Sequence, residues 1–232
     1  MYSPRVSKML RLKATVLKTT VLKTMVLAIL LPGLAAQLVP ADGQLEGKAL
    51  VEALRKGGYT IYFRHAETDW SKGDNVGGMG GWTSCDPGRM RQLSAKGRET
   101  ARRIGAAIRK LGIPVGRVLS SEYCRAAETA RRMGLGRVVT TRNLMNMRVA
   151  DYMGGDDAVA ARARQVIATP PPEGTNTVIA AHGNLMRAAT GHYVGEGGAG
   201  IFRPDGKGSF TFIAEVTPEQ WTRLAGRFGK GR

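Results

Sequence analysis

Three short segments carry residue types that could bind and attack an anionic group. Arg64 and His65 are adjacent at the end of an apolar run, and Arg125 and His182 each follow a later apolar run. An arginine offers a planar fork of N–H donors that suits phosphate, and a neutral histidine can act as a nucleophile. This set of side chains predicts chemistry on a phosphoryl group.

We expect β-strands to position these side chains. Residues 58–63, 115–120 and 176–181 are short, apolar and rich in β-branched residues, which predicts three buried strands. In an open α/β sheet, ligands bind at the carboxyl ends of the strands, so we expect the three segments to meet there. The remaining pattern predicts helices at 45–56, 94–111, 156–168, 185–190 and from 217 onward, further strands at 137–139 and 210–216, and loops at 69–92 and 191–208.

These motifs resemble a known family. Residues 64–68, Arg-His-Ala-Glu-Thr, resemble the Arg-His-Gly-Glu-Thr signature of the histidine phosphatase superfamily, the phosphoglycerate-mutase-like proteins. Residues 93–101 and 120–130 resemble its Leu-Ser-x-x-Gly-x-x-x-Ala and Ser-Ser-x-x-x-Arg-x-x-x-Thr-Ala segments, and His182-Gly183 resembles its second histidine. The resemblance covers nearly all of residues 57–225 and implies a three-layer α/β/α fold with a mostly parallel central sheet.

The resemblance also implies roles for particular residues. His65 would accept the phosphoryl group, and Arg64, Arg125 and His182 would hold its oxygens. Thr68 and Gly183 would help to bind the substrate. No metal and no cofactor would be required.

The sequence departs from the family at the carboxylic acid that protonates the leaving oxygen. Many relatives have a glutamate after the third strand, but residues 141–148 contain no acid. Asp151 is the nearest candidate, and Glu67, Glu122 and the Asp156-Asp157 pair remain alternatives. The missing glutamate weighs against a mutase and favours branches without that acid, including phosphohistidine-protein phosphatases.

The first 41 residues have the pattern of an export signal. They contain six lysines and arginines and no acid, and an uncharged apolar run at 25–39 leads into small residues. This arrangement predicts a cleaved signal peptide, residues 1–41, before a domain at 42–232. The run is shorter than a membrane-spanning helix needs and contains Pro32-Gly33, so a periplasmic or secreted domain is expected, with an uncleaved anchor as the alternative.

The chain contains two cysteines, Cys85 and Cys124. In an exported protein an even number of cysteines favours a disulfide, and two unpaired buried thiols are the alternative. The cysteines and the three histidines show no metal-ligand spacing, so no metal site is expected.

The net charge of +17 favours an anionic partner. We expect a metal-independent phosphomonoester hydrolase acting on a phosphorylated metabolite, glycolipid or phosphoprotein. The chain also resembles exported bacterial members of the superfamily, which include lipopolysaccharide core heptose-phosphate phosphatases. The alternative is a phosphate-binding pseudoenzyme. A nucleic-acid binder is disfavoured, because aromatic residues make up only 6% and do not interleave with the basic clusters. The oligomeric state is not predicted.

Overall fold

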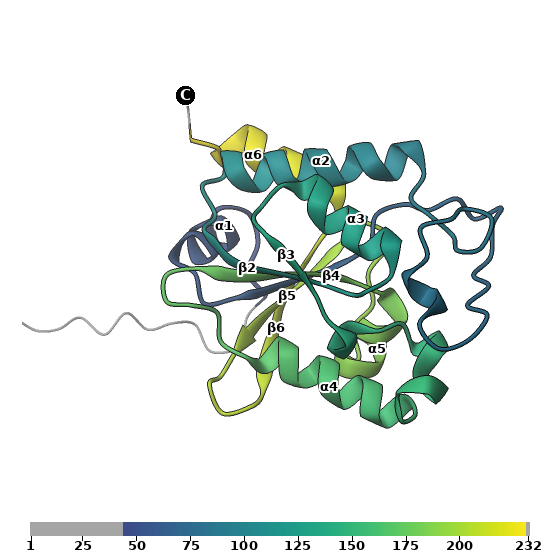
Figure 1. The fold of residues 1–232 in the computed structure, drawn as a ribbon. Helices are drawn as coiled ribbons and strands as arrows, with labels where there is room; N and C mark the ends of the chain where they lie inside the picture. Colours follow the sequence, from purple (N-terminus) through teal and green to yellow (C-terminus); the bar gives the residue numbers. More distant parts are fainter. Residues whose placement is uncertain (1–43, 231–232) are drawn as a thin grey trace, which may run out of the picture. The chain divides into compact units, whose positions relative to one another are not determined.

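One sheet forms the centre of residues 44–230, the part of the chain that the computed structural model describes (Figure 1). Its strand order is β3-β2-β4-β1-β5-β6. The first four of these strands are parallel, whereas β5 is antiparallel to both β1 and β6. The strands are β1 (Thr60–Arg64), β2 (Val115–Ser120), β3 (Val138–Thr140), β4 (Asn176–Ala181), β5 (Ala199–Pro204) and β6 (Phe210–Val216). The predicted α/β fold with a mostly parallel sheet is confirmed.

Helices cover both faces of the sheet (Figure 1). On one face lie α1 (Gly47–Lys56), α2 (Ala95–Lys110), α3 (Cys124–Met133) and α6 (Pro218–Phe228). On the other face lie α4 (Asp156–Ala168) and α5 (Gly183–Thr190). Short 3₁₀ helices occur at η1 (Gly81–Thr83), η2 (Arg142–Leu144) and η3 (Met147–Met153). The predicted export signal at 1–41 lies outside the described residues.

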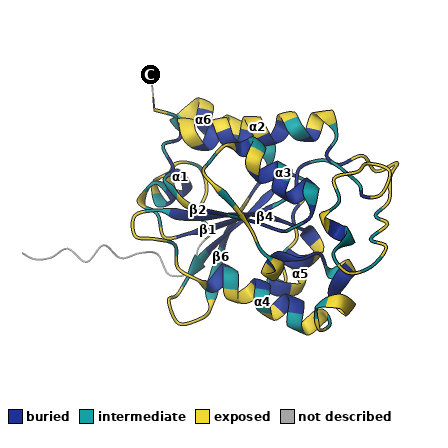
Figure 2. Cartoon of the chain, in the orientation of Figure 1, coloured by how far each residue is buried: buried dark blue, intermediate teal, exposed yellow. Residues whose placement is uncertain are grey.

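The central strands are buried on both sides, as Figure 2 shows by their dark blue colour. Ile61 and Phe63 of β1 pack into the core beneath α1, α2 and α6, where Phe63 lies against Trp221. Tyr62, between them, points to the opposite core beneath α4 and α5. Every residue of β4 is buried. Strands covered on both faces read as continuous apolar runs, which explains why the sequence pattern located them.

The strand register aligns the three predicted segments. Arg64 of β1 is paired with Ala181 of β4, and Ser120 of β2 is paired with Ala180. One residue further on, the His65 amide donates to the Ala181 carbonyl at 2.9 Å. The carboxyl ends of the three strands therefore meet at one edge of the sheet, as predicted.

The prediction of a continuous loop at 191–208 is wrong, because β5 lies within it. Residues Ala199–Phe202 are buried and pair with β1 on one side and β6 on the other. The glycines of this segment suggested a loop, but packing favours a glycine at position 200: a Cβ atom there would lie 2.9 Å from the Phe202 ring. Tertiary contacts thus overrode the local propensity.

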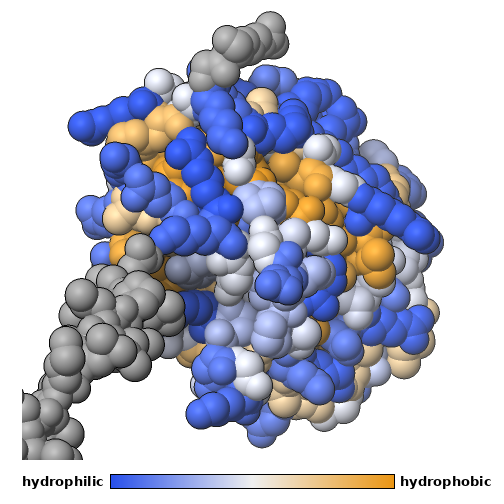
Figure 3. Space-filling view, turned by 90° about the vertical axis from the view of Figure 1, so that its left-hand side faces the viewer, coloured by the Kyte–Doolittle hydropathy of each residue, from blue (hydrophilic) through white to orange (hydrophobic). Residues whose placement is uncertain are grey.

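The surface of the domain mixes polar and apolar groups, and Figure 3 shows both kinds on one face. A cavity of about 720 Å³ lies between α1, β6 and α6, away from the aligned strand ends. Within residues 44–230, no helix combines the length and the apolar character needed to cross a membrane.

Candidate functional site

A cavity of about 150 Å³ lies where the three strand ends meet. It brings together Arg64, His65, Arg125, His182 and Gly183, all of them predicted site residues. The lining contains four arginines and two histidines and, among the described residues, no carboxylate. Such a wall favours an anionic ligand. The lining residues are Arg64, His65, Trp70, Arg91, Arg125, Asn146, Arg148, His182, Gly183, Asn184 and Tyr193.

His65 follows β1 directly, and only 3% of its surface is exposed. Its Nδ1 lies 3.0 Å from the Ala66 carbonyl oxygen. A carbonyl can only accept, so Nδ1 carries the hydrogen and Nε2 keeps a free lone pair. Burial, and then the nearby charge of Arg125, holds the pKa of His65 well below its usual value of 6.5. The ring therefore stays neutral near pH 7 and suits a nucleophile.

His182 is the N-cap residue of α5 and is also buried. Its Nε2 lies 2.9 Å from the Ser121 hydroxyl, whereas its Nδ1 is buried without a hydrogen-bond partner in the structure. The Tyr62 hydroxyl donates to the His182 carbonyl at 3.0 Å and anchors the backbone. Burial, followed by the charge of Arg125, lowers the pKa of His182 well below 6.5. In the tautomer in which the Ser121 hydroxyl donates to Nε2, Nδ1 carries a hydrogen that an anion would accept.

Arg125 is the second residue of α3 and is 1% exposed. Its Nε is buried without a hydrogen-bond partner among residues 44–230, as is Nε of Arg91. Together with Nδ1 of His182, they make three buried nitrogens without a hydrogen-bond partner among the described residues that line the cavity. A buried donor without an acceptor costs about 1–3 kcal/mol. The oxygens of a phosphoryl group are acceptors of the kind that such arginine N–H groups bind.

The start of α5 lies against Arg64. A Cβ atom on Gly183 would come within 2.7 Å of the Tyr193 ring and 3.0 Å of Cδ of Arg64. Glycine therefore allows Arg64 to pack against this helix end, where it donates to the Tyr193 hydroxyl. The N-terminus of a helix carries the positive end of the helix dipole, which adds to an anion site.

Thr68 does not line the cavity, in contrast to the sequence prediction. It is buried, and its hydroxyl donates to Oε1 of Glu196 at 2.7 Å. Glu196 also accepts from Nε1 of Trp70 at 3.2 Å, and its Oε1 lies 3.7 Å from Nη2 of Arg64. Thr68 therefore belongs to a layer behind the cavity wall, which supports Arg64 through Glu196.

The acid predicted from the sequence is not in the cavity. Asp151 lies on the 3₁₀ helix η3, which turns it toward solvent. Glu67 forms an ion pair with Lys96 at 2.8 Å, and Glu122 accepts from Trp82 and Arg142. The Asp156-Asp157 pair is exposed in the first turn of α4.

Two other carboxylates lie closest to the predicted site, and the sequence did not indicate either of them. Asp74 pairs with Arg125, and Oε1 of Glu196 lies 3.9 Å from Nδ1 of His65. Neither residue is part of the cavity lining. Both lie in segments that had been predicted as loops without periodicity, so no local pattern marked them.

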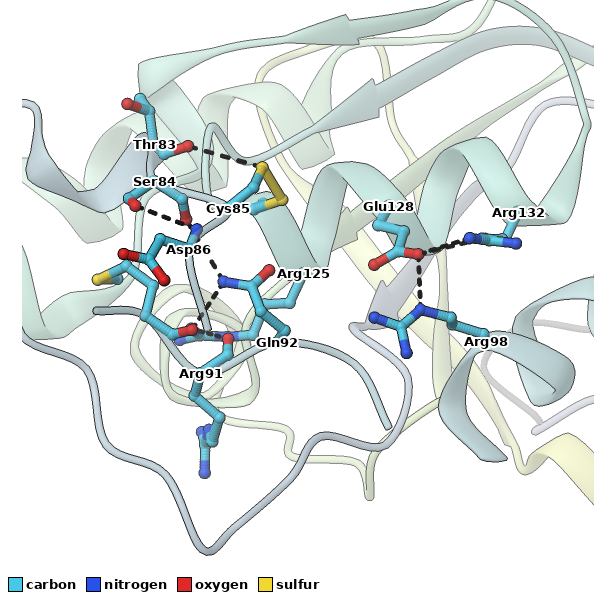
Figure 4. The surroundings of a disulfide bond; sticks show 12 residues. Thr83, Ser84, Cys85, Asp86, Arg91, Gln92, Arg98, Arg125, Glu128 and Arg132 are labelled. Atoms are coloured by element: carbon cyan, nitrogen blue, oxygen red, sulfur yellow. Dashed lines mark hydrogen bonds and ion pairs between the residues drawn. A yellow bond between two sulfur atoms is a disulfide. The ribbon is translucent and has the colours of Figure 1, made fainter. Parts of the chain in front are cut away.

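The disulfide between Cys85 and Cys124 is confirmed by the structure (Figure 4). Cys85 belongs to the 69–92 loop, and Cys124 is the first residue of α3, directly before Arg125. The bond therefore ties the loop to the helix that carries a cavity arginine. Within residues 44–230, no group of three or more His, Cys, Asp or Glu side chains could hold a metal ion.

Comparison with known proteins identifies a family. Residues 61–165 match the model of the histidine phosphatase superfamily (branch 1), a segment that includes Arg64, His65 and Arg125. The sequence has no match among curated proteins.

Three of the solved structures with similarity to this chain are named as phosphatases. A mycobacterial glucosyl-3-phosphoglycerate phosphatase has 17% identity and a TM-score of 0.49 over 69% of this chain and 100% of that chain. A phosphoserine phosphatase mutant from Entamoeba histolytica has 14% identity and a TM-score of 0.48 over 70% and 98% of the two chains. The protein histidine phosphatase SixA, complexed with tungstate, has 16% identity and a TM-score of 0.46 over 69% and 97%.

The two buried histidines predict a dependence of stability on pH. Their folded-state pKa values lie below 6.5, so the unfolded chain binds protons first as the pH falls. Their contribution is fully present above pH 6.5 and is lost as the pH falls toward the folded values. As the pH falls through that range, each histidine should reduce the free energy of unfolding by up to about 1.4 kcal/mol per pH unit, because its unfolded form gains a proton that its folded form does not.

Urea unfolding between about pH 7 and about pH 5 would measure this slope. His65→Gln and His182→Gln should each make the decline shallower. A decline that neither variant changes would show that these histidines do not cause it.

Proposed function

The chain belongs to the histidine phosphatase superfamily, and we propose that it hydrolyses phosphomonoesters through a phosphohistidine intermediate on His65. One observation carries this proposal: the neutral His65, with a free lone pair on Nε2, lines a small cavity that is also lined by four arginines and, among the described residues, by no carboxylate. A phosphoryl group would complement this positive charge and would also be the group that Nε2 attacks.

The proposed reaction has two steps. In the first, Nε2 of His65 attacks phosphorus, the N–P bond forms, and the bond to the leaving oxygen breaks in line with it. In the second, water attacks the phosphohistidine, the N–P bond breaks, and inorganic phosphate leaves with His65 restored. Arg64, Arg125 and Nδ1 of His182 hold the phosphoryl oxygens and stabilise the charge as it redistributes.

Protonation of the leaving oxygen is the step for which the described lining residues offer no carboxylic acid. No described carboxylate lines the cavity, so the leaving oxygen takes its proton from water or departs as an anion. This arrangement favours substrates with good leaving groups. The positive charges of the arginines would take the place of a metal ion, and metal independence is part of the proposal.

Hydrolysis of 4-nitrophenyl phosphate by the wild type and by His65→Ala is the central test. We expect wild-type turnover that a chelator does not reduce, and a loss of about a thousandfold or more in the variant, because the nucleophile is absent. His192→Ala is the matched control, since His192 lies outside the cavity, stacked on Phe212.

Other outcomes would change the proposal. If the wild type and His65→Ala were equally inert but both bound phosphate, the protein would be a phosphate-binding pseudoenzyme. Turnover that the chelator abolished would contradict the metal-independent mechanism.

Two arginines of the cavity lining, Arg91 and Arg148, favour a substrate whose leaving group is negatively charged. Arg148 is exposed at the lining, and the Arg91 guanidinium lies 3.6 Å from the centre of the Trp70 ring. No ion pair of either arginine with a carboxylate occurs within residues 44–230. A phosphorylated metabolite, glycolipid or phosphoprotein with a second negative charge near the phosphoryl group would complement them.

Two substrates can be compared to measure the effect of a negative charge on the leaving group. 4-Carboxyphenyl phosphate and 4-carbamoylphenyl phosphate have nearly the same shape and differ in the charge of the leaving group. We expect Arg148→Gln to lower kcat/KM for the carboxylate by roughly fivefold and to leave the amide nearly unchanged.

The control for this comparison is Arg131→Gln, which removes an exposed arginine of α3 outside the cavity lining. It should affect the two substrates alike. An equal loss on both substrates in Arg148→Gln would mean that Arg148 does not recognise the leaving group.

Export to the periplasm or the exterior is also proposed. The basic and apolar pattern of residues 1–41 supports it, and so does the Cys85–Cys124 disulfide, since such bonds persist in oxidising compartments. Expression of the full chain in a bacterial host should yield periplasmic protein whose N-terminus lies near residue 42. Intact chain that remained in the cytoplasm would contradict export, and intact chain in the membrane fraction would indicate an uncleaved anchor.

A further inference from the structure

Asp74 and Arg125 form a buried ion pair beside the cavity. The two Nη nitrogens of Arg125 donate to the two carboxylate oxygens of Asp74, both at 2.9 Å. The side chains are only 1% and 5% exposed. Asp74 comes from the 69–92 loop, whereas Arg125 comes from α3, so the pair joins segments that are far apart in the sequence.

The hydrogen bonds of Arg125 leave one edge of its guanidinium free. A guanidinium has five N–H donors arranged around a plane. Asp74 takes two of them on the Nη1–Nη2 edge, and the Arg91 carbonyl accepts a third from Nη1 at 3.3 Å. The Nε–H, which is buried without a partner, and the second hydrogen of Nη2 remain. These two lie on the same side edge, which can bind two oxygens of one phosphoryl group.

Asp74 is itself held in place from the loop. The Arg91 amide donates to Oδ1 of Asp74 at 3.1 Å. The loop is further attached to the start of α3 by the Cys85–Cys124 disulfide, with Arg125 next to it (Figure 4). The carboxylate is thus fixed before any substrate arrives.

We propose that Asp74 is a positioning residue, which occupies the end edge of Arg125 and thereby aims the side edge at the substrate phosphoryl group. If the Asp74 carboxylate occupied the phosphoryl site itself, Asp74 would line the cavity, but it is not among the lining residues. Without its partner, Arg125 would be a buried charge without compensation and would lose its fixed orientation. The inference rests on the proposed phosphoryl site, and it concerns binding rather than turnover.

The test uses inorganic phosphate as the probe and the protein as expressed. Phosphate affinity would be measured from the rise in melting temperature with phosphate concentration, for the wild type, Asp74→Asn and Asp74→Ala. We expect both variants to bind phosphate roughly tenfold or more weakly, because a charge-assisted bidentate contact is lost. Asp69→Asn is the matched control: Asp69 is exposed in the same loop, and within the described part of the chain its side chain accepts hydrogen bonds from Ser71 alone.

A double-mutant cycle separates positioning from a general effect on stability. In an Arg125→Lys background, Asp74→Asn should cause little further loss of phosphate affinity, since the fork that Asp74 positions is gone. Equal losses in both backgrounds would overturn the proposal. Asp74→Glu keeps the charge but shifts the carboxylate by one methylene, so it too should weaken phosphate binding.

Tighter phosphate binding in Asp74→Asn would also overturn the proposal, because it would mean that Asp74 opposes the anion. Should Asp74→Asn fail to fold, Asp74→Glu carries the test, and wild-type affinity in that variant would contradict the geometric role. The proposed function can fail separately. If the protein did not hydrolyse phosphomonoesters but bound phosphate in a way that depended on Asp74, the proposed hydrolysis would be refuted and the positioning role of Asp74 would be supported.

Discussion

The parallel pairing of β1 with β4, and of β4 with β2, is the constraint on which the site depends. The register places Arg64 beside Ala181 and Ser120 beside Ala180. The residues that follow, His65, His182 and the start of α3, therefore meet at one sheet edge. A shift of one residue in any of these strands would turn its side chains to the other face. Burial of both faces of the sheet makes such a shift costly, so the cores on either side hold the geometry of the candidate site.

Burial also sets the chemistry of this edge. A histidine removed from water and surrounded by arginines favours its neutral form, which is the form that can attack phosphorus. The same burial leaves Nε of Arg125 and Nδ1 of His182 without hydrogen-bond partners among the described residues. A site with these properties is costly for the empty protein and favourable once an anion enters.

Carboxylates balance part of this positive charge from behind the cavity wall. Glu196 lies beside Arg64, and Asp74 pairs with Arg125. Both come from irregular segments, the 69–92 loop and the turn before β5. The disulfide between Cys85 and Cys124 fastens the first of these segments to α3. The disulfide thus limits how far this irregular segment can move from α3.

The sequence by itself determined the parallel strands, the helices between them and the identity of the residues at the strand ends, because apolar runs and local motifs carry that information. It also indicated the disulfide, since two cysteines allow only one intramolecular pairing. Only the tertiary structure decided which acids approach the site, because Asp74 and Glu196 have no local pattern and Asp151 is turned outward by a short helix. Strand β5 was missed for a similar reason, since its pairing with β1 and β6 outweighs its glycines. Local sequence records propensity and periodicity, whereas contacts between distant loops depend on how the whole chain packs.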